Sequence, residues 1–123
     1  LGNGELGNYL NLFLWEDTNA DGVYDAPGEI ALSGPALFGS GLILPIHDST
    51  TGNGALVAST TEYIGSAWCA GTQNVDNNTG AITCDGSTMG NIAQTDSLSA
   101  DLTFYAEQVR NNPGFQCSSL LIP

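Results

Sequence analysis

Lysine is absent from the sequence, and Arg110 is the only arginine. Thirteen carboxylates face this single cation, so the formal net charge at pH 7 is −12. A chain this acidic repels nucleic acids and anionic membranes and attracts divalent cations. Without lysine it forms neither a Schiff base nor the lysine-to-asparagine isopeptide bonds of some pili, so any assembly must be non-covalent or disulfide-linked.

Long apolar runs and helical periodicity are missing as well. The first absence argues against membrane insertion, and no segment repeats apolar residues at the 3.6-residue period of a helix. With 123 residues and 41% hydrophobic content the chain can still bury one core, so we expect a single domain over residues 1–123. Its 16 glycines, set among many Ser, Thr and Asn residues, favour a β-rich exported protein with tight turns.

Short apolar segments separated by turn residues predict β-strands. Residues 9–15 combine aromatic and aliphatic side chains over seven positions and run directly into an acidic turn, which is typical of a largely buried strand. Residues 99–110 alternate apolar and polar side chains, which is typical of a strand with one wet face. Other strands are predicted at residues 29–32, 41–46 and 61–69, with a break at 33–35 and tight turns at 76–80 and 85–87. Tyr63 and Trp68 are expected to anchor the 61–69 strand.

This pattern predicts an all-β fold, either an antiparallel β-sandwich or a jelly roll. Open sheet edges attract a complementary strand, so we expect the fold to be incomplete without upstream or partner strands. The chain begins at Leu1 with no initiator Met and no signal sequence. We therefore interpret it as a processed or excerpted polypeptide whose signal peptide lay upstream.

The cysteines are an odd set of three. Cys69 and Cys84 flank one turn-rich segment, and a bridge between them would close a loop of about 15 residues, worth about 3 kcal/mol in the chain-entropy model. Cys117 would then bond to a partner outside this segment. A zinc site is the alternative, but the wide spacing and the lack of a second histidine favour the disulfide.

Residues 17–25 read DTNADGVYD and have the spacing of a calcium loop. Asp17, Asn19 and Asp21 stand at positions 1, 3 and 5, and Gly22 at position 6 permits the sharp bend. A loop wrapped around a cation presents every second side chain inward, and hard oxygen ligands select calcium or magnesium.

The rest of the predicted ligand set departs from an EF-hand. The carbonyl of Val23 can supply position 7 and Asp25 position 9, but the downstream acid, Glu29, stands at position 13 rather than 12. No amphipathic helix flanks the loop, so the better comparison is a calcium loop between strands, where the ion would rigidify the domain. The alternative is an Asp/Asn/Gly-rich turn that holds no metal.

Signals for catalysis are weak. His47 is the only histidine and neighbours Asp48 and Ser49, but a triad is recognised by geometry, and Ser-rich loops supply chance neighbours. Asp96 and Asp101 could form a glycosidase pair, yet nothing in the sequence brings them together. We therefore predict no catalytic residues.

Two further features have a structural and a functional interpretation. Trp15 and Trp68 could be sugar-binding platforms, but aromatic residues within strands more often belong to the core. Asn77-Asn78-Thr79 matches an N-glycosylation sequon, in a segment expected to be a loop tip.

Ordered short motifs run from Glu5 to Cys117 and are densest in the second half of the chain. They read YIGSAWCAGT at residues 63–72, CDG at 84–86, NIAQTDSL at 91–98, FYAEQVRNN at 104–112 and FQC at 115–117. Through these motifs the chain resembles the camelysin/TasA family of secreted bacterial and archaeal fibre proteins. The resemblance implies that residues 1–123 are the larger, C-terminal part of a jelly-roll domain.

The resemblance also implies a function. It implies secretion to the extracellular space or cell surface, and homopolymerisation into biofilm-matrix fibres through a strand donated from one subunit to the next. Other matrix components are further possible partners. Family members carry a signal peptide, an N-terminal strand and about half of the jelly roll before the region that matches Glu5, so the donor strand is not located in this sequence.

Two other functions compete with the fibre subunit. Some members of the family were labelled metalloproteases, but one histidine and no zinc-binding helix argue against proteolysis here. A monomeric secreted calcium-binding adhesin or carbohydrate-binding module is the remaining alternative to a fibre subunit.

Overall fold

The computed structural model describes residues 5–38, 41, 43–49, 51, 54–108, 114 and 116. The chain divides into two compact units, one formed by Leu1–Gly41 and Glu62–Ala100, the other by Leu42–Thr61 and Asp101–Pro123. The single domain over residues 1–123 stays a prediction. All strands of the described residues lie in the first unit.

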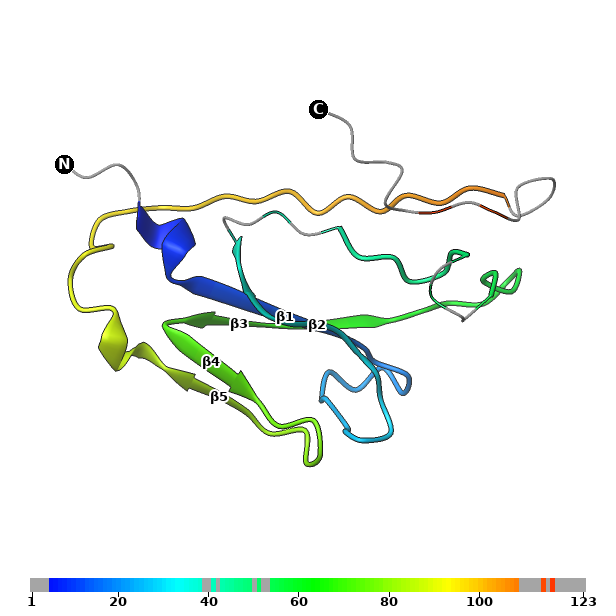
Figure 1. Cartoon of the computed structure of the whole chain (residues 1–123), viewed down its shortest axis with the longest axis horizontal. Coiled ribbons are helices and arrows are strands. Elements are labelled where there is room, and N and C mark those ends of the chain that lie inside the picture. The colour runs from blue at the N-terminus through cyan, green and yellow to red at the C-terminus, as the bar shows by residue number, and fades with distance from the viewer. Residues whose placement is uncertain are drawn as a thin grey trace. The chain divides into compact units, whose positions relative to one another are not determined.

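The first unit contains two antiparallel sheets, which confirms the predicted all-β class (Figure 1). In the three-stranded sheet, β1 (Leu10–Glu16) lies between β2 (Ala31–Leu37) and β3 (Ile64–Ala70). In the two-stranded sheet, β4 (Thr72–Val75) pairs with β5 (Ile82–Asp85). The predicted strands at residues 9–15 and 61–69 are confirmed as β1 and β3, with slightly shifted ends.

The core forms where alternate side chains of β1 meet a residue of the following loop. Phe13 and Trp15 point to the same side of the sheet and are buried with Tyr24. The Phe13 ring centroid lies 5.6 Å from that of Trp15 and 5.0 Å from that of Tyr24, in stacked and edge-on contact. Partly buried residues of both sheets and of the loop after β1 pack against this cluster, namely Ala26, Ala31, Ala67, Val75 and Ile82.

The two sheets are also joined covalently. A disulfide links Cys69 in β3 to Cys84 in β5, with Cα atoms 5.6 Å apart, so the predicted pairing is confirmed. Two antiparallel sheets packed through a shared core and stapled in this way are compatible with an incomplete β-sandwich. The jelly-roll topology stays a prediction, and Cys117 lies outside the described residues.

The predicted break at residues 33–35 is wrong. Strand β2 runs through this segment, and β1 and β2 pair with register shifts between Leu12 and Leu14 and between Leu14 and Trp15. Strand β2 lies at the edge of its sheet, so it can include Pro35, which has no N–H to donate, and absorb the irregularity as a bulge. The predicted return of the chain as a hairpin after the acidic turn is confirmed.

Two other predicted strands are absent from the described part of the chain. The described residues of 41–46 and of 99–110 form no strand. Alternation alone cannot make a strand without a neighbouring strand to receive its backbone hydrogen bonds. Conversely, β4 and β5 were not predicted, because each is only four residues long and rich in polar residues. They flank the correctly predicted turn at residues 76–80.

Tyr63 and Trp68 do not anchor β3. Their side chains are 51% and 69% exposed, whereas Gly65 and Cys69 of the same strand are buried. Alternation puts residues 65, 67 and 69 on the inner face and Trp68 on the outer one. The core interpretation is therefore correct for Trp15 and wrong for Trp68.

Helical structure is limited to single turns in the described residues. Two of these are the 3₁₀ turns η1 (Glu5–Asn8) and η3 (Gly86–Thr88), and η3 overlaps the predicted tight turn at 85–87. The side chain of Asp85 caps η3 by accepting a hydrogen bond from the backbone N–H of Ser87. Hydrogen bonds from the hydroxyl and the N–H of Ser87 lower the pKa of Asp85.

Candidate metal centre in the acidic loop

The acidic loop, residues 17–29, connects β1 to β2. Its two ends are fixed by backbone hydrogen bonds, since the N–H of Glu16 donates to the carbonyl of Ile30 and the N–H of Asp17 to the carbonyl of Tyr63. The buried run of β1 leads directly into the loop, so its first acid is carried into the protein rather than left in solvent.

Asp17 is only 5% exposed and organises the first half of the loop. Its carboxylate accepts the N–H of Gly22 at 2.8 Å and that of Asp21 at 3.2 Å. Gly22 has φ +77°, which costs glycine little and other residues more. The bend predicted at Gly22 is therefore present, and it wraps the backbone around the Asp17 side chain.

Glu29 closes the second half of the loop and is also only 5% exposed. Its Oε2 accepts the N–H of Thr18 at 2.8 Å, and its Oε1 accepts the N–H of Asp25 at 2.9 Å. One carboxylate thus joins the beginning of the loop to its end. Each oxygen keeps further acceptor capacity, because a carboxylate offers about four lone-pair sites.

The three remaining predicted side-chain ligands lie on the exposed side of the loop. The Asn19 Nδ2 donates to Oδ2 of Asp25 at 3.0 Å and to Oδ2 of Asp21 at 3.2 Å. Asn19 thereby places positively polarised amide hydrogens between two carboxylates, which is where a cation would balance their charge. A half-turn of this amide exchanges Nδ2 for Oδ1 and would add an oxygen ligand.

The loop therefore brings the predicted ligands into one segment, but their carboxylates are not arranged as a complete metal site. In the described part of the chain, Asp17, Asp21 and Asp25 do not bring three carboxylate oxygens within 4.8 Å of one another. Val23 donates its N–H to Oδ1 of Asp21 at 2.8 Å. Its side chain is apolar, so its backbone carbonyl is the group that could bind a metal ion. An oxygen-only donor set of this kind suits calcium or magnesium rather than softer metals.

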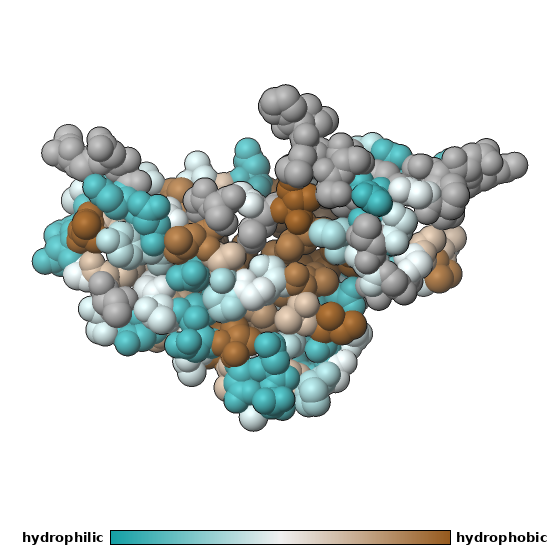
Figure 2. Space-filling model, viewed as in Figure 1, coloured by the Kyte–Doolittle hydropathy of each residue, from teal (hydrophilic) through white to brown (hydrophobic). Residues whose placement is uncertain are grey.

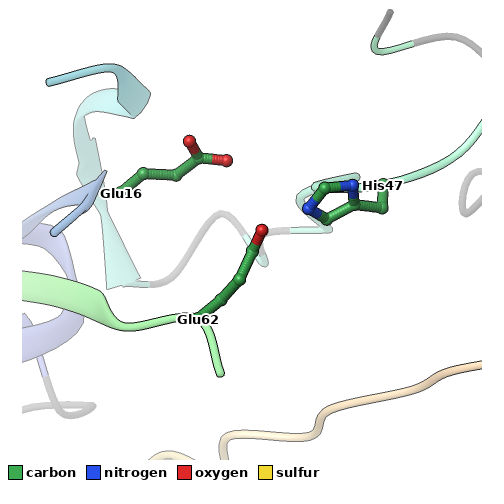
Figure 3. A group of neighbouring side chains, drawn as sticks. All are labelled: Glu16, His47 and Glu62. Carbon is green, nitrogen blue, oxygen red and sulfur yellow. The ribbon is translucent and has the colours of Figure 1, made fainter. Parts of the chain in front are cut away.

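Two more carboxylates approach each other where β1 ends and β3 is about to begin. Glu16 and Glu62 each offer an oxygen, and these atoms lie within 4.8 Å of one another (Figure 3). Two such oxygens could hold a metal ion together. Sequence patterns do not reveal this pair because 45 residues separate its members, and only the antiparallel pairing of β1 with β3 brings them together.

The other residues singled out in the sequence lie apart from the acidic loop or belong to the second unit. His47, labelled in Figure 3, belongs to the second unit, where its Nδ1 lies 2.8 Å from the carbonyl oxygen of Gly54. Asp96 is in the first unit and accepts the N–H of Glu5 at 2.8 Å, whereas Asp101 is in the second unit.

The turn between β4 and β5 contacts the acidic loop. The hydroxyl of Tyr24 donates to Oδ1 of Asn77 at 2.8 Å, which joins the predicted sequon to the loop. The turn is held in shape by Asp76, whose side chain accepts the N–H groups of Asn78 and Thr79. These hydrogen bonds lower the pKa of Asp76, and the one from Asn78 has the largest effect. The sequence indicated a turn at this place but not its contact with the loop.

Strand β3 has one edge paired with β1 and one edge to which no described strand is added. The N–H of Asp17 donates to the carbonyl of Tyr63, and the N–H of Gly71 donates to the carbonyl of Tyr9. In this register the backbone N–H and C=O groups of the odd-numbered residues of β3 point toward β1. The N–H and C=O groups of Ser66 and Trp68 consequently point outward along the strand's other edge. The same strand exposes the Trp68 side chain.

The outer face of the sheet is apolar near this edge. Leu12 lies directly opposite Trp68, and Leu14 opposite Ser66. Both leucines are half-buried, while Trp68 is largely exposed. Figure 2 shows hydrophobic residues at several places on the face of the molecule that it draws. An exposed apolar area beside an open strand edge is typical of a site for a partner.

Comparison with known proteins adds no family assignment, because no protein-family model, curated protein or solved structure matches the chain. Among the described residues, no helix is long and apolar enough to cross a membrane. The disulfide between Cys69 and Cys84 is consistent with an extracellular location.

Proposed function

We propose that this chain is a secreted structural subunit of an extracellular fibre, in which a strand of one copy adds to a sheet edge of the next. The observation that carries the proposal is the outer edge of β3, which directs the backbone groups of Ser66 and Trp68 away from β1. The resemblance to camelysin/TasA proteins supports the same function.

Strand addition would stabilise this edge in two ways. A partner strand would receive the outward N–H and C=O groups in a regular ladder, and its side chains would pack beside the exposed Trp68. Burial of apolar surface contributes about 25 cal/mol per Å². A net charge of −12 opposes association of copies at low ionic strength, so salt or divalent cations should favour assembly.

The edge can be tested with proline. Ser66→Pro removes an N–H that points outward and leaves the β1–β3 ladder intact, because Ser66 belongs to a non-hydrogen-bonded pair with Leu14. We expect a folded variant that forms no filaments in electron micrographs, while Ser66→Ala assembles like the parent. Filaments from folded Ser66→Pro, or only monomers of the parent under calcium-replete, native conditions, would contradict the proposal.

We propose further that the acidic loop binds calcium and thereby stiffens the subunit. Asp17, Asn19, Asp21, Asp25 and Glu29 would supply side-chain oxygens, and Val23 its carbonyl. Support comes from the convergence of Asp21 and Asp25 on the Asn19 amide. Calorimetric titration should show one site that is abolished in Asp17→Ala and in Asp21→Ala. Asp101→Ala removes the same charge outside the loop and should bind like the parent, and no heat from the parent would refute the site.

Calcium should also raise thermal stability. A ligand that binds only the folded state adds RT ln(1 + [L]/Kd), about 2.7 kcal/mol at a hundred times Kd. The melting temperature of the parent should therefore rise with calcium concentration, and that of Asp17→Ala should not.

A second function is favoured by one observation, the 69% exposure of Trp68 on the outer face of the sheet. A flat indole of this kind could stack against a sugar ring, as in a monomeric adhesin or carbohydrate-binding module. Binding on a glycan array that is lost in Trp68→Ala, together with an absence of filaments, would favour this function over the fibre.

A further inference from the structure

Tyr24 stands at the point where the acidic loop meets the core. It lies between two predicted ligand positions, Val23 and Asp25, yet its own side chain is buried. Its ring contacts Phe13 edge-on at 5.0 Å and lies 5.8 Å from Trp15. The position of this ring in the core therefore fixes the position of the loop backbone on either side of Tyr24.

The β4–β5 turn holds Tyr24 from the opposite side of the loop. Asn77 accepts the hydrogen bond of the Tyr24 hydroxyl, and Gly80 packs against the Tyr24 backbone. A Cβ at Gly80 would lie 2.1 Å from the Tyr24 carbonyl oxygen and 3.2 Å from the N of Ala26. Gly80 also has φ +81°, so no other residue suits this contact.

The turn that makes these contacts has little freedom of its own. Asp76 accepts N–H groups from Asn78 and Thr79 through its side chain, and its backbone carbonyl accepts the N–H of Gly80 at 2.7 Å. Strands β4 and β5 on either side add Val75 and Ile82 to the packing around the core. The turn is thus held in one conformation, and one side of the acidic loop packs against it.

We propose that Asn77 is a positioning residue for the acidic loop: it fixes Tyr24, and through Tyr24 the flanking positions Val23 and Asp25 that would hold a cation. This inference rests on the proposed calcium site. It implies that the β4–β5 turn contributes to the cation affinity of the loop, although Asn77 lies more than 50 residues from Tyr24 in sequence. It also makes the coupling reciprocal, so that a cation in the loop protects the turn against opening.

The size of the effect follows from the single hydrogen bond. One intramolecular hydrogen bond contributes on the order of 0.5–1.5 kcal/mol, which corresponds to an affinity change of about two- to tenfold. Loss of the Asn77 acceptor should therefore weaken calcium binding by about this factor.

The first experiment is calcium titration by calorimetry on non-glycosylated protein. Asn77→Ala and Tyr24→Phe should each weaken binding about two- to tenfold, and the double variant should be no weaker than the worse single variant because both remove the same bond. Asn77→Asp keeps an acceptor oxygen and should restore binding. Asn78→Ala, a change at the neighbouring exposed residue, should leave it unchanged. Equal affinities of Asn77→Ala and Asn78→Ala would overturn the inference.

A second measurement separates this inference from the calcium proposal. Hydrogen exchange without calcium should show faster exchange of the Gly22 and Val23 amides in Asn77→Ala than in Asn78→Ala. If the parent gives no calcium heat but this difference is present, the calcium site fails and the positioning role of Asn77 stands. If calcium binds and neither exchange nor affinity responds to Asn77→Ala, the positioning role fails and the calcium site stands.

Discussion

Gly65 lies directly opposite Trp15 in the β1–β3 ladder, and the indole ring covers the place where a side chain would be. A Cβ built at Gly65 would lie 2.1 Å from Cε2, 2.3 Å from Cζ2 and 2.7 Å from Cδ2 of Trp15. Real Cβ atoms do not come so close to ring carbons, so Gly65→Ala must displace the ring. The ring has little room to move because it packs on Phe13 and Tyr24.

Two opposing effects set the magnitude for Gly65→Ala. Overpacking a core typically costs about 1–3 kcal/mol, and three close contacts to a buried ring argue for the upper end. Replacing Gly by Ala also lowers the entropy of the unfolded chain, which stabilises the fold by about 0.4–1 kcal/mol. We therefore expect a net loss of about 2 kcal/mol in the free energy of unfolding, and a melting temperature lower by on the order of 5–10 °C.

The assay is chemical denaturation of Gly65→Ala beside Gly34→Ala, which makes the same substitution in the neighbouring strand β2. Nothing lies within 4 Å of a Cβ at Gly34, so Gly34→Ala should be neutral or more stable by up to about 1 kcal/mol. If Gly65→Ala unfolds at the same denaturant concentration as the parent, the packing of Trp15 on β3 is not as described.

Three other predictions concern the staple, the loop and the turn. Cys84→Ser, which removes the disulfide to Cys69, should lower the free energy of unfolding by about 3 kcal/mol for a 15-residue separation, and a denaturation midpoint of the parent that does not change with reductant would contradict this. Each carboxylate oxygen of Glu29 accepts a hydrogen bond from a backbone N–H, and Glu29→Gln replaces one of these oxygens by an NH₂ group that cannot accept it. We therefore expect the free energy of unfolding to fall by about 2 kcal/mol in the same assay. Asp76 has a pKa below its ordinary value in the fold, so its ionised form stabilises the turn at pH values above about 3.9, and this contribution is lost as the pH falls through the lower, folded pKa. An NMR titration should show that lowered pKa, and a pKa at or above the ordinary value would refute it.

Local patterns were sufficient to predict the parts of the fold that depend on neighbours in sequence. Residues 9–15 contain β1 because a segment rich in aromatic and aliphatic side chains suits a strand, whose alternate residues Phe13 and Trp15 enter the core. The bend at Gly22 and the turn at residues 76–80 follow from residue types that adopt these conformations at little cost. The disulfide follows from two cysteines on either side of one turn.

Strand length and side-chain direction were harder to predict. The segment 99–110 has the alternation of a strand but forms none in its described residues, because a strand exists only with a partner. Trp68 and Trp15 are the same residue type in similar surroundings, and a shift of one position along a strand decides which of them is buried.

By itself, the sequence determined that this protein is acidic, β-rich and disulfide-bonded, and that residues 17–29 are spaced for oxygen ligation, since charge, turn chemistry and local periodicity are properties of short segments. Only the tertiary structure decided that Tyr24 joins the acidic loop to the core, that Asn77 contacts Tyr24 from another hairpin, and that no strand of the described residues adds to the outer edge of β3. The physical reason is that each of these contacts unites segments far apart in the chain, and their meeting depends on sheet register and packing rather than on local preference.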